Sequence, residues 1–474
     1  MGVPTGGRVE AAPPLARIAR RAVPIAILVA AGVLVPLTAL GSRLPLLIAG
    51  LAVGVVGIYG LWWWPEIGFP LLVPTSMLVP VTISTGAQTG VNAALLLAMA
   101  MLGMWVVDMV ARKREVTLAP SSTVVPLLGW MIACLLSFGF GRLNWLPGEG
   151  SPLTGQLGGL ALLILLPGMF MLSFNQLRNL RTLRWTTWLF LSLGGIFIAG
   201  ILIPGNAPRT FGTYQRAVTD AMFWTWLVTI CFSQAAFNRQ LKPGLRLLLG
   251  AIACGAFYYM IEVRQSWTSG WLPAAVSIWI VLLVARPRWA IAALLVTGGL
   301  ALLAPGAVNE LLLGGDNAYS MQTRLEAWRI IWKIVRLSPI FGVGPANYFA
   351  YTPLYPILGF SVNFNSHNNY LDIVAQVGFV GLGFFIWFMI ALVKVLLRAV
   401  RQAPQGFPQA FALGAVGALA GMLVSGLLGD WMIPFLYNIG LEGFRAAVLG
   451  WTFLGAAAAM GEPNGLAATS GGIG

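Results

Sequence analysis

Long apolar runs recur along nearly the whole chain of 474 residues. Most are about 17 to 25 residues long, the length that an α-helix needs to cross roughly 30 Å of hydrocarbon. The strands of a membrane barrel would instead alternate apolar and polar residues over about 10 positions, a pattern that this sequence lacks. The sequence therefore predicts an all-α polytopic membrane protein.

The apolar runs divide the chain into three expected parts. These are an N-terminal bundle (1–304), a loop domain (305–370), and C-terminal helices with a short tail (371–474). Two weak segments, 45–63 and 66–84, are interrupted by tryptophans and prolines, and removing this pair leaves the orientation of later segments unchanged. We therefore expect about 12, and up to 14, transmembrane helices. The segments are 24–41, 45–63, 66–84, 90–110, 123–140, 155–173, 185–203, 218–236, 245–262, 269–285, 289–304, 371–393, 409–428 and 440–459.

The formal net charge of +14 could indicate a nucleic-acid partner, but the distribution of the charge argues against one. Of the 28 lysines and arginines, 18 fall in the N-terminal tail and in alternate short loops. This is the distribution that the positive-inside rule describes, so the charge is a topology signal. We expect both termini in the cytoplasm, with the first apolar run retained as an anchor, and no nucleic-acid partner.

The other ten basic residues are expected on the outer side, and nine of them are arginine. Arginine is always charged, and its planar fork matches the oxygens of a phosphate group. Arg216 precedes one apolar segment and can alternatively form an ion pair with Asp220. Arg264 follows another and can alternatively pair with Glu262 or extend toward the membrane surface. If both point to one spot, they can hold a diphosphate at the membrane surface.

The long outer segment contains an expected amphipathic helix at 320–337. Arg324, at its start, is the basic residue on it that we single out as a candidate for function. Its other charges are interpreted as a surface that faces water or lipid headgroups. Five apolar residues recur at helical spacing, namely Leu325, Trp328, Ile331, Trp332 and Val335.

A glycine-rich turn, Ser338–Pro345, follows this helix, and its backbone N–H groups could lie near an anion. Tyr348, Tyr351 and Tyr355 come next, among prolines. An aromatic surface of this kind suits the face of a sugar and suits a membrane interface equally well.

His367 is the only histidine in the chain, and it precedes the apolar run 371–393. Asn365 or Ser366 can serve as the N-cap, which would place His367 in the first helical turn. The helix dipole there favours the neutral imidazole that a general base requires. Asp372 is expected about 140° further round the helix and thus too far to orient the ring.

No residue pattern indicates a metal or another cofactor. Cys134, Cys231 and Cys254 all fall within apolar segments and are interpreted as small buried side chains. The acidic residues of the outer side are scattered, without an Asp-x-Asp or Glu-x-Asp pair. We therefore expect a metal-independent protein.

Four short motifs together resemble the O-antigen ligase/polymerase family. They are Arg324–Trp328, Pro339–Gly344, His367–Leu371 and Gly378–Gly381, so the strong likeness covers about 58 residues. The resemblance implies a GT-C-type membrane glycosyltransferase of the bacterial inner membrane, with a long periplasmic loop and a periplasmic active site. The ligase branch transfers O-antigen polysaccharide from undecaprenyl diphosphate to a hydroxyl of lipid A-core.

The resemblance also implies roles for individual residues. His367 matches the essential loop histidine of the family. Arg216 and Arg264 are expected to be catalytic by holding the diphosphate of the donor. At Arg264 the sequence Val263-Arg264-Gln265 departs from the family's usual Ser-Arg-Gly element. The expected substrate-binding residues are Arg324, Arg209, Tyr214, Trp328, Asn368 and Tyr348.

Other functions stay open from the sequence. Within the family, a polymerase would use a second carrier-linked glycan as acceptor, and a protein-glycosylating ligase would use a pilin-like protein. A transporter of an anion or lipid should carry ionisable groups near the membrane midplane. Here these groups gather at segment ends and in the outer loop, which favours chemistry at the interface.

Overall fold

The computed structural model describes residues 57, 59–84, 90–145, 147–177, 179–214, 216–264, 267–314 and 317–462. The chain divides into two compact units, Met1–Gly68 and Phe69–Gly474. In the first unit the described residues include the 3-10 helix η2 (Pro65–Ile67). The predicted segment 24–41 and most of 45–63 lie outside the described residues. The second unit holds every candidate site residue.

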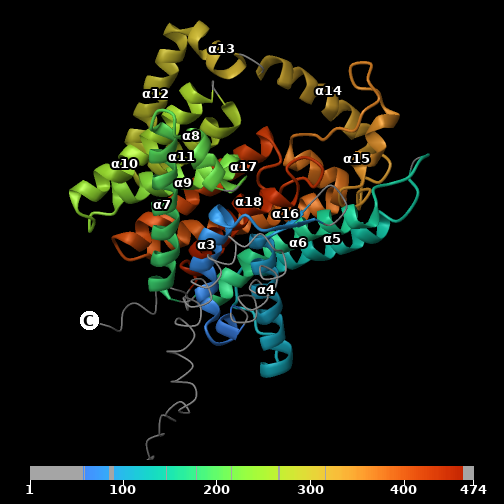
Figure 1. Ribbon diagram of the computed structural model, residues 1–474, viewed down its shortest axis with the longest axis horizontal. Coiled ribbons are helices and arrows are strands. Elements are labelled where there is room, and N and C mark those ends of the chain that lie inside the picture. Colours follow the sequence, from blue (N-terminus) through green and yellow to red (C-terminus); the bar gives the residue numbers. More distant parts are fainter. Residues whose placement is uncertain are drawn as a thin grey trace, which may run out of the picture. The chain divides into compact units, whose positions relative to one another are not determined.

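Helices dominate the described part of the chain (Figure 1). The first half contains α3 (Gly68–Leu78), β1 (Thr82–Ser84), β2 (Gly90–Asn92), α4 (Ala93–Val107), η3 (Asp108–Lys113), α5 (Val124–Phe140), α6 (Leu153–Gln176), α7 (Leu180–Leu202), α8 (Ala207–Thr213), η4 (Arg216–Thr219) and α9 (Ala221–Phe237). The second half contains α10 (Pro243–Tyr258), η5 (Tyr259–Val263), α11 (Thr268–Ala285), α12 (Pro287–Leu303), α13 (Pro305–Leu313), α14 (Asn317–Val335), α15 (Tyr348–Tyr351), η6 (Thr352–Leu354), α16 (Asn369–Gln402), α17 (Phe407–Leu428), η7 (Gly440–Gly443) and α18 (Phe444–Ala459).

The prediction of a polytopic helical membrane protein is confirmed. Among the described residues, seven helices are long and apolar enough to cross a membrane, or up to eight if the bent pair α12–α13 counts as one. They are Ala93–Lys113, Leu153–Gln176, Leu180–Leu202, Pro243–Val263, Thr268–Ala285, Asn369–Gln402 and Phe407–Leu428, and the shorter α5 and α9 are also apolar. The finer expectation of 12 to 14 spans stays a prediction.

Two predicted segments differ from single spans. In 66–84, α3 has only 11 residues and the chain then forms β1, which pairs antiparallel with β2. The prediction of an all-α protein is therefore incomplete, because the chain also contains this small β-hairpin. In 289–304, α12 ends at Leu303 and turns by 102° into α13. Proline at the first position of α13 explains the turn, because it cannot continue the hydrogen bonding of the preceding helix.

The hairpin is fixed in place by a buried arginine of α18. Arg445 is fully buried and donates to the carbonyl oxygens of Thr75, Ser76, Val79 and Val81 at or beyond the end of α3. The carbonyl groups of Thr75 and Ser76 lie in the last turn of α3, which leaves them without a partner inside the helix. Its Nε also lies 2.6 Å from Glu442 Oε2. Arg445, expected among the outward arginines, thus has a structural role.

The loop after α14 is built into a break in α16. At Gly378 the backbone leaves the helical conformation, with φ of 74°. Phe379 N and Val380 N donate to the carbonyl oxygens of Pro339 and Ile340, at 2.8 and 3.2 Å. In return, Ala375 O and Gln376 O accept from Val343 N and Gly344 N, at 2.9 and 3.1 Å. The loop thus replaces two hydrogen bonds that an unbroken helix would make.

Glycine is required on both sides of this junction. Gly342 and Gly378 have φ of 72° and 74°, a region that other residues rarely adopt. A Cβ at Gly342 would overlap the carbonyl oxygen of Gln376, and one at Gly378 would overlap that of Ile340. The motifs Pro339–Gly344 and Gly378–Gly381 are therefore two halves of one contact.

Replacing Gly378 with alanine is expected to weaken this junction. The backbone strain alone costs roughly 1–3 kcal/mol, and the overlap with Ile340 adds to it. We expect a lower midpoint of thermal unfolding for Gly378→Ala in detergent. Gly383→Ala is the control, because a Cβ at Gly383 meets nothing within 4 Å. Equal unfolding midpoints for both variants would contradict the proposed junction.

Candidate functional site

His367 lies in a turn just before α16 rather than in its first helical turn. The N-cap is Asn368, whose side chain accepts from Tyr370 N and Leu371 N. The prediction of Asn365 or Ser366 as N-cap was therefore wrong. His367 adopts φ of 49°, which is uncommon for a residue with a side chain. Backbone strain of this kind persists only where neighbouring groups hold the residue in place.

Four side chains hold the turn around His367. Trp328 Nε1 donates to the carbonyl oxygen of Ser366 at 2.7 Å, which ties the turn to α14. Ser366 Oγ accepts from Asn368 N at 2.8 Å and lies 2.7 Å from Asp372 Oδ1. The Tyr348 hydroxyl donates to the same Asp372 oxygen. Asp372 thus holds the turn and not the imidazole, in keeping with its expected direction.

Tyr348 does not face a substrate in this structure. It is fully buried, and its ring stacks on Phe435 with 4.9 Å between the ring centroids. Burial, with Asp372 and its hydrogen bond, raises the pKa of Tyr348, so its hydroxyl remains a donor. The prediction that Tyr348 binds substrate does not fit this position. Its hydrogen bond to Asp372 makes it a residue that positions the His367 turn.

The residues between α17 and α18, which we call the 429–443 loop, form the other wall of the site. Asn369 fastens this loop to the start of α16. Its Oδ1 accepts from Met432 N at 2.9 Å, and its Nδ2 donates to Ile433 O at 2.6 Å. In His367-Asn368-Asn369, the first asparagine therefore caps the helix and the second fixes the loop beside the histidine.

Asp430 and Asn438 of this loop approach the imidazole. Asn438 Nδ2 donates to Asp430 Oδ1 at 2.8 Å and lies 3.5 Å from His367 Nδ1. Asp430 Oδ1 is 3.8 Å from the same ring nitrogen, too far for a hydrogen bond but close enough to pair with a protonated ring. The carboxylate is buried, whereas 41% of the histidine side chain is exposed. The ring is thus open on one side and faces a carboxylate and an amide on the other.

Arg324 contacts the chain just before the 429–443 loop. Its Nη1 donates to Leu428 O at 3.0 Å, at the end of α17, and its buried Nε has no partner. Two more buried N–H groups also lack a partner among the described residues. They are Asn365 Nδ2, two residues before His367, and Trp431 Nε1 in the 429–443 loop. Unpaired buried donors are costly, so each of these groups requires a further hydrogen-bond partner.

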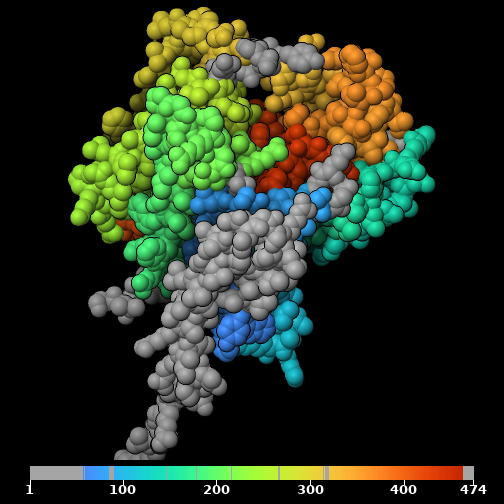
Figure 2. All heavy atoms as spheres, in the orientation of Figure 1, coloured from blue at the N-terminus to red at the C-terminus, as the bar shows by residue number. Residues whose placement is uncertain are grey.

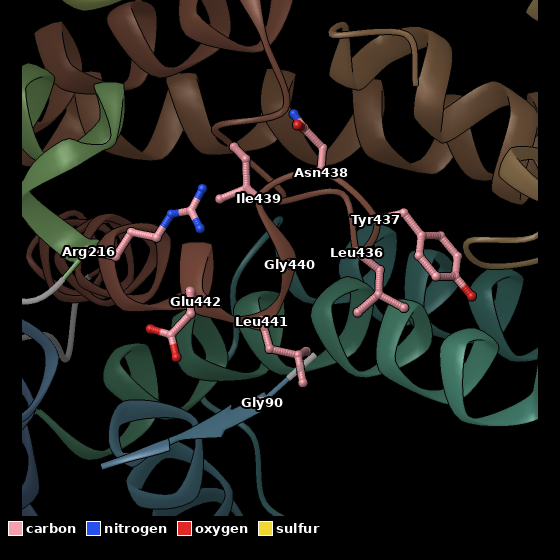
Figure 3. A pocket seen from close by; sticks show the side chains of 9 residues that line it. All are labelled: Gly90, Arg216, Leu436, Tyr437, Asn438, Ile439, Gly440, Leu441 and Glu442. Atoms are coloured by element: carbon pink, nitrogen blue, oxygen red, sulfur yellow. The ribbon is translucent and has the colours of Figure 1, made fainter. Parts of the chain in front are cut away.

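Arg216 reaches the site from η4. It lines a cavity of about 160 Å³ together with Gly90 and residues 436–442, including Asn438. Figure 3 shows its guanidinium extending toward the loop, near Ile439 and Glu442. Glu442 is engaged by Arg445 and by Thr82 Oγ1. Among the described residues Arg216 forms no ion pair, so the alternative of a pair with Asp220 is not found.

The structure thus links three predicted residues through the 429–443 loop. Arg216 and Asn438 line the same cavity, Asn438 Nδ2 lies 3.5 Å from His367 Nδ1, and Arg324 donates to Leu428 O, two residues before Asp430. In Figure 2 the red residues after α17 reach the surface beside the gold and orange residues of α14 and α15.

The other predicted residues lie further from His367. The Arg264 guanidinium stacks over Trp267 at 5.1 Å, and Trp267 packs edge-on against Trp431. Arg264 therefore reaches the 429–443 loop only through aromatic rings. Tyr214 is buried and donates to Leu193 O at 2.7 Å, so a role in substrate binding does not fit it. Arg209 is exposed on α8, and no contact of its side chain with this site is found in the described part of the chain.

The electrostatics of the site keep the imidazole neutral. Burial and the nearby Arg324 charge lower the pKa of His367 to about 4. Asp430 does not reverse this, because 3.8 Å is too long for a hydrogen bond and burial also raises the pKa of its own carboxyl. The neutral ring expected from the helix dipole is therefore supported, but by burial and Arg324 instead.

Sequence reasoning missed Asp430, Asn438 and Ser366. Asp430 counted only as one of several scattered acidic residues, because the 60 or so residues between it and His367 carry no local signal. The available hint was an acidic residue flanked by Gly429 and Trp431 where an apolar run ends.

The pKa of His367 can be measured directly, because the chain has one histidine. We expect the ring of selectively labelled protein to titrate in NMR spectra near pH 4, below the usual value of about 6.5. Protonation should accordingly destabilise the fold as the pH falls from about 6.5 toward 4.

Arg324→Gln should raise the midpoint of the His367 titration, because it removes a nearby positive charge. Arg329→Gln, on an exposed face of α14, should leave it unchanged. A wild-type midpoint near 6.5 that stays the same in Arg324→Gln would contradict this description.

Comparison with known proteins supports the likeness drawn from the motifs. A search of curated proteins gave no match. Residues 247–386 match a family model described as O-antigen ligase. The match includes Arg264, Arg324 and His367, whereas Arg216 and the 429–443 loop lie outside it. The predicted family assignment is confirmed over these residues: the chain carries a domain of the O-antigen ligase family.

Proposed function

We propose that this protein is an O-antigen ligase. It would transfer a polysaccharide from undecaprenyl diphosphate to a hydroxyl group of lipid A-core, at the periplasmic face of a bacterial inner membrane. The observation that supports the proposal is that Asn438 lines the same cavity as Arg216 and lies 3.5 Å from His367 Nδ1. An anion-binding group and a base within one site are what glycosyl transfer from a lipid diphosphate requires.

His367 acts as the general base in this proposal. The acceptor hydroxyl attacks the anomeric carbon of the first sugar and gives its proton to the imidazole. The bond between that carbon and the diphosphate oxygen breaks, and its electron pair leaves with undecaprenyl diphosphate. A single displacement inverts the anomeric centre. Asp430, 3.8 Å from Nδ1, would stabilise the imidazolium that forms.

Arg216 holds the diphosphate as negative charge grows on the leaving oxygen. Its guanidinium forms no ion pair among the described residues, and Glu442 of the same cavity is already paired with Arg445, so both arms of its fork are available to phosphate. Stabilising the charge that develops in the transition state is often what accelerates an enzymatic reaction most. The unpaired Nε of Arg324 adds a donor on the histidine side. Arg264 has a supporting position behind Trp267 and Trp431.

The reaction is proposed to need no metal ion. Among the described residues, no three His, Cys, Asp or Glu side chains are grouped as metal ligands. The arginines would supply the positive charge. Loss of transfer on adding EDTA, with recovery on adding a divalent cation, would contradict this part of the proposal.

This proposal and its alternatives within the family differ in the molecule that accepts the polysaccharide. A polymerase would place a second carrier-linked glycan beside His367, and a protein-glycosylating ligase would place a pilin-like protein there. Transport of an anion or lipid is the alternative of another class. The partly exposed imidazole favours a reaction over transport, because a transporter has no need of a base at an open surface.

The test is transfer by purified protein in nanodiscs. Given undecaprenyl diphosphate-linked glycan and lipid A-core, wild type should form a ladder of glycosylated products. His367→Ala should lower the rate roughly 10²–10⁴-fold, and Arg216→Lys, which loses the planar fork, about 10²-fold or more. Arg142→Lys, an exposed arginine away from the cavity, is the control.

Each outcome separates the hypotheses. Extension of carrier-linked glycan without transfer to lipid A-core would identify a polymerase. Transfer only to a pilin-like protein would identify the third family function. A folded protein that transfers to no acceptor while moving lipid or anion across a vesicle would overturn the proposal.

A further inference from the structure

A second hollow lies between α14 and α16, beside the His367 turn. This groove has a volume of about 720 Å³, and none of the residues of the Arg216 cavity line it. Three of its apolar side chains remain well exposed, Leu325 by 48%, Trp332 by 40% and Phe379 by 47%. Trp332 and Phe379 pack edge to face across it, at 6.1 Å between centroids. Its remaining apolar lining is Trp328, Tyr370, Leu371, Val374 and Leu382.

Basic side chains border this apolar surface. Arg329, Lys333 and Arg336 all line the groove and recur every three or four residues, so they follow one side of α14. Arg329 has an exposed pair with Glu326, which is worth little in water. Lys333 lies 5.8 Å from the ring of Tyr355, an attraction that leaves its charge in place. Arg336 has no acidic partner among the described residues.

The groove is also connected to the proposed base. Asn368 lines the groove and directly follows His367 in the chain. Trp328 lines it too, and its indole nitrogen donates to Ser366 O, directly before His367. An amphiphile in the groove would therefore lie with one end beside the His367 turn. The apolar lining and the basic border match acyl chains and phosphate groups respectively.

We propose that this groove binds the acceptor as an acylated, phosphate-bearing lipid. Its acyl chains would lie against Trp332, Phe379 and Leu325, with phosphate on Lys333 and Arg336. This inference rests on the proposed function, since it places the acceptor on one side of His367 and the donor diphosphate at Arg216 on the other. The two lipids would thus enter by separate hollows and meet at the imidazole.

Binding can be measured apart from transfer. The probes are diphosphorylated lipid A and its monophosphorylated form, presented to protein in nanodiscs. Wild type should bind the diphosphorylated lipid more tightly. In Lys333→Gln/Arg336→Gln this preference should fall about tenfold, the order expected for one charge-assisted hydrogen bond. Trp332→Ala should weaken both lipids alike. Arg142→Gln, which removes an exposed positive charge away from the groove, is the control, and unfolding midpoints check that the exposed substitutions leave the fold intact.

Kinetics then distinguish acceptor from donor. In the groove variants, KM for the acceptor should rise while KM for undecaprenyl diphosphate-linked glycan stays unchanged. If wild type binds lipid A by this groove but transfers nothing, the proposed function fails and the groove assignment stands. A rise in KM for the donor instead would overturn the inference, because the groove would then hold the carrier lipid. Equal competition by phosphatidylglycerol would also overturn it, by assigning the groove to bulk membrane lipid.

Discussion

The exchange of hydrogen bonds at Gly378 is the interaction on which the site depends. α16 gives up two helical hydrogen bonds there, and the Pro339–Gly344 loop replaces both at once. The backbone of a long apolar helix would otherwise leave polar groups unpaired, which is costly away from water. The exchange fastens the segment after α14 to a spanning helix. It thereby holds α14 and α15 over the start of α16, where His367 lies.

Around this junction, the polar side chains mostly bind the protein itself, and few are left for a ligand. Tyr348, Asp372 and Ser366 hold the histidine turn, and Asn369 fastens the 429–443 loop to it. Among the described residues, the buried Arg324 Nε, Asn365 Nδ2 and Trp431 Nε1 have no hydrogen-bond partner, the Arg216 guanidinium lines the cavity without an ion pair, and one edge of the imidazole is open. This division explains how a residue with uncommon backbone geometry can be held rigidly while one edge of its ring stays exposed.

Much of this could be predicted from the sequence, and the limits have physical reasons. The apolar runs predicted most of the spanning helices, and the helical spacing of the apolar residues from Leu325 to Val335 predicted α14. Both signals are local in the sequence, so they can be recognised without the structure. The prediction of the apolar face of α14 was only partly correct, because Leu325 and Trp332 remain exposed in the groove. Asp430, Asn438 and the role of Arg445 depend on contacts between distant segments, for which a single sequence has no periodic signal. Tyr214 and Tyr348 are buried, a position that their sequence could not indicate, because a tyrosine packed in a core and one facing a sugar look alike in sequence.

The central claim is that donor diphosphate and general base meet at the 429–443 loop. The most direct measurement is a cryo-EM structure of the protein in nanodiscs with undecaprenyl diphosphate. Our description predicts phosphate density in the cavity that Arg216 and Asn438 line, with His367 facing the position of the first sugar. Phosphate density bound elsewhere, with this cavity filled only by solvent, would contradict it.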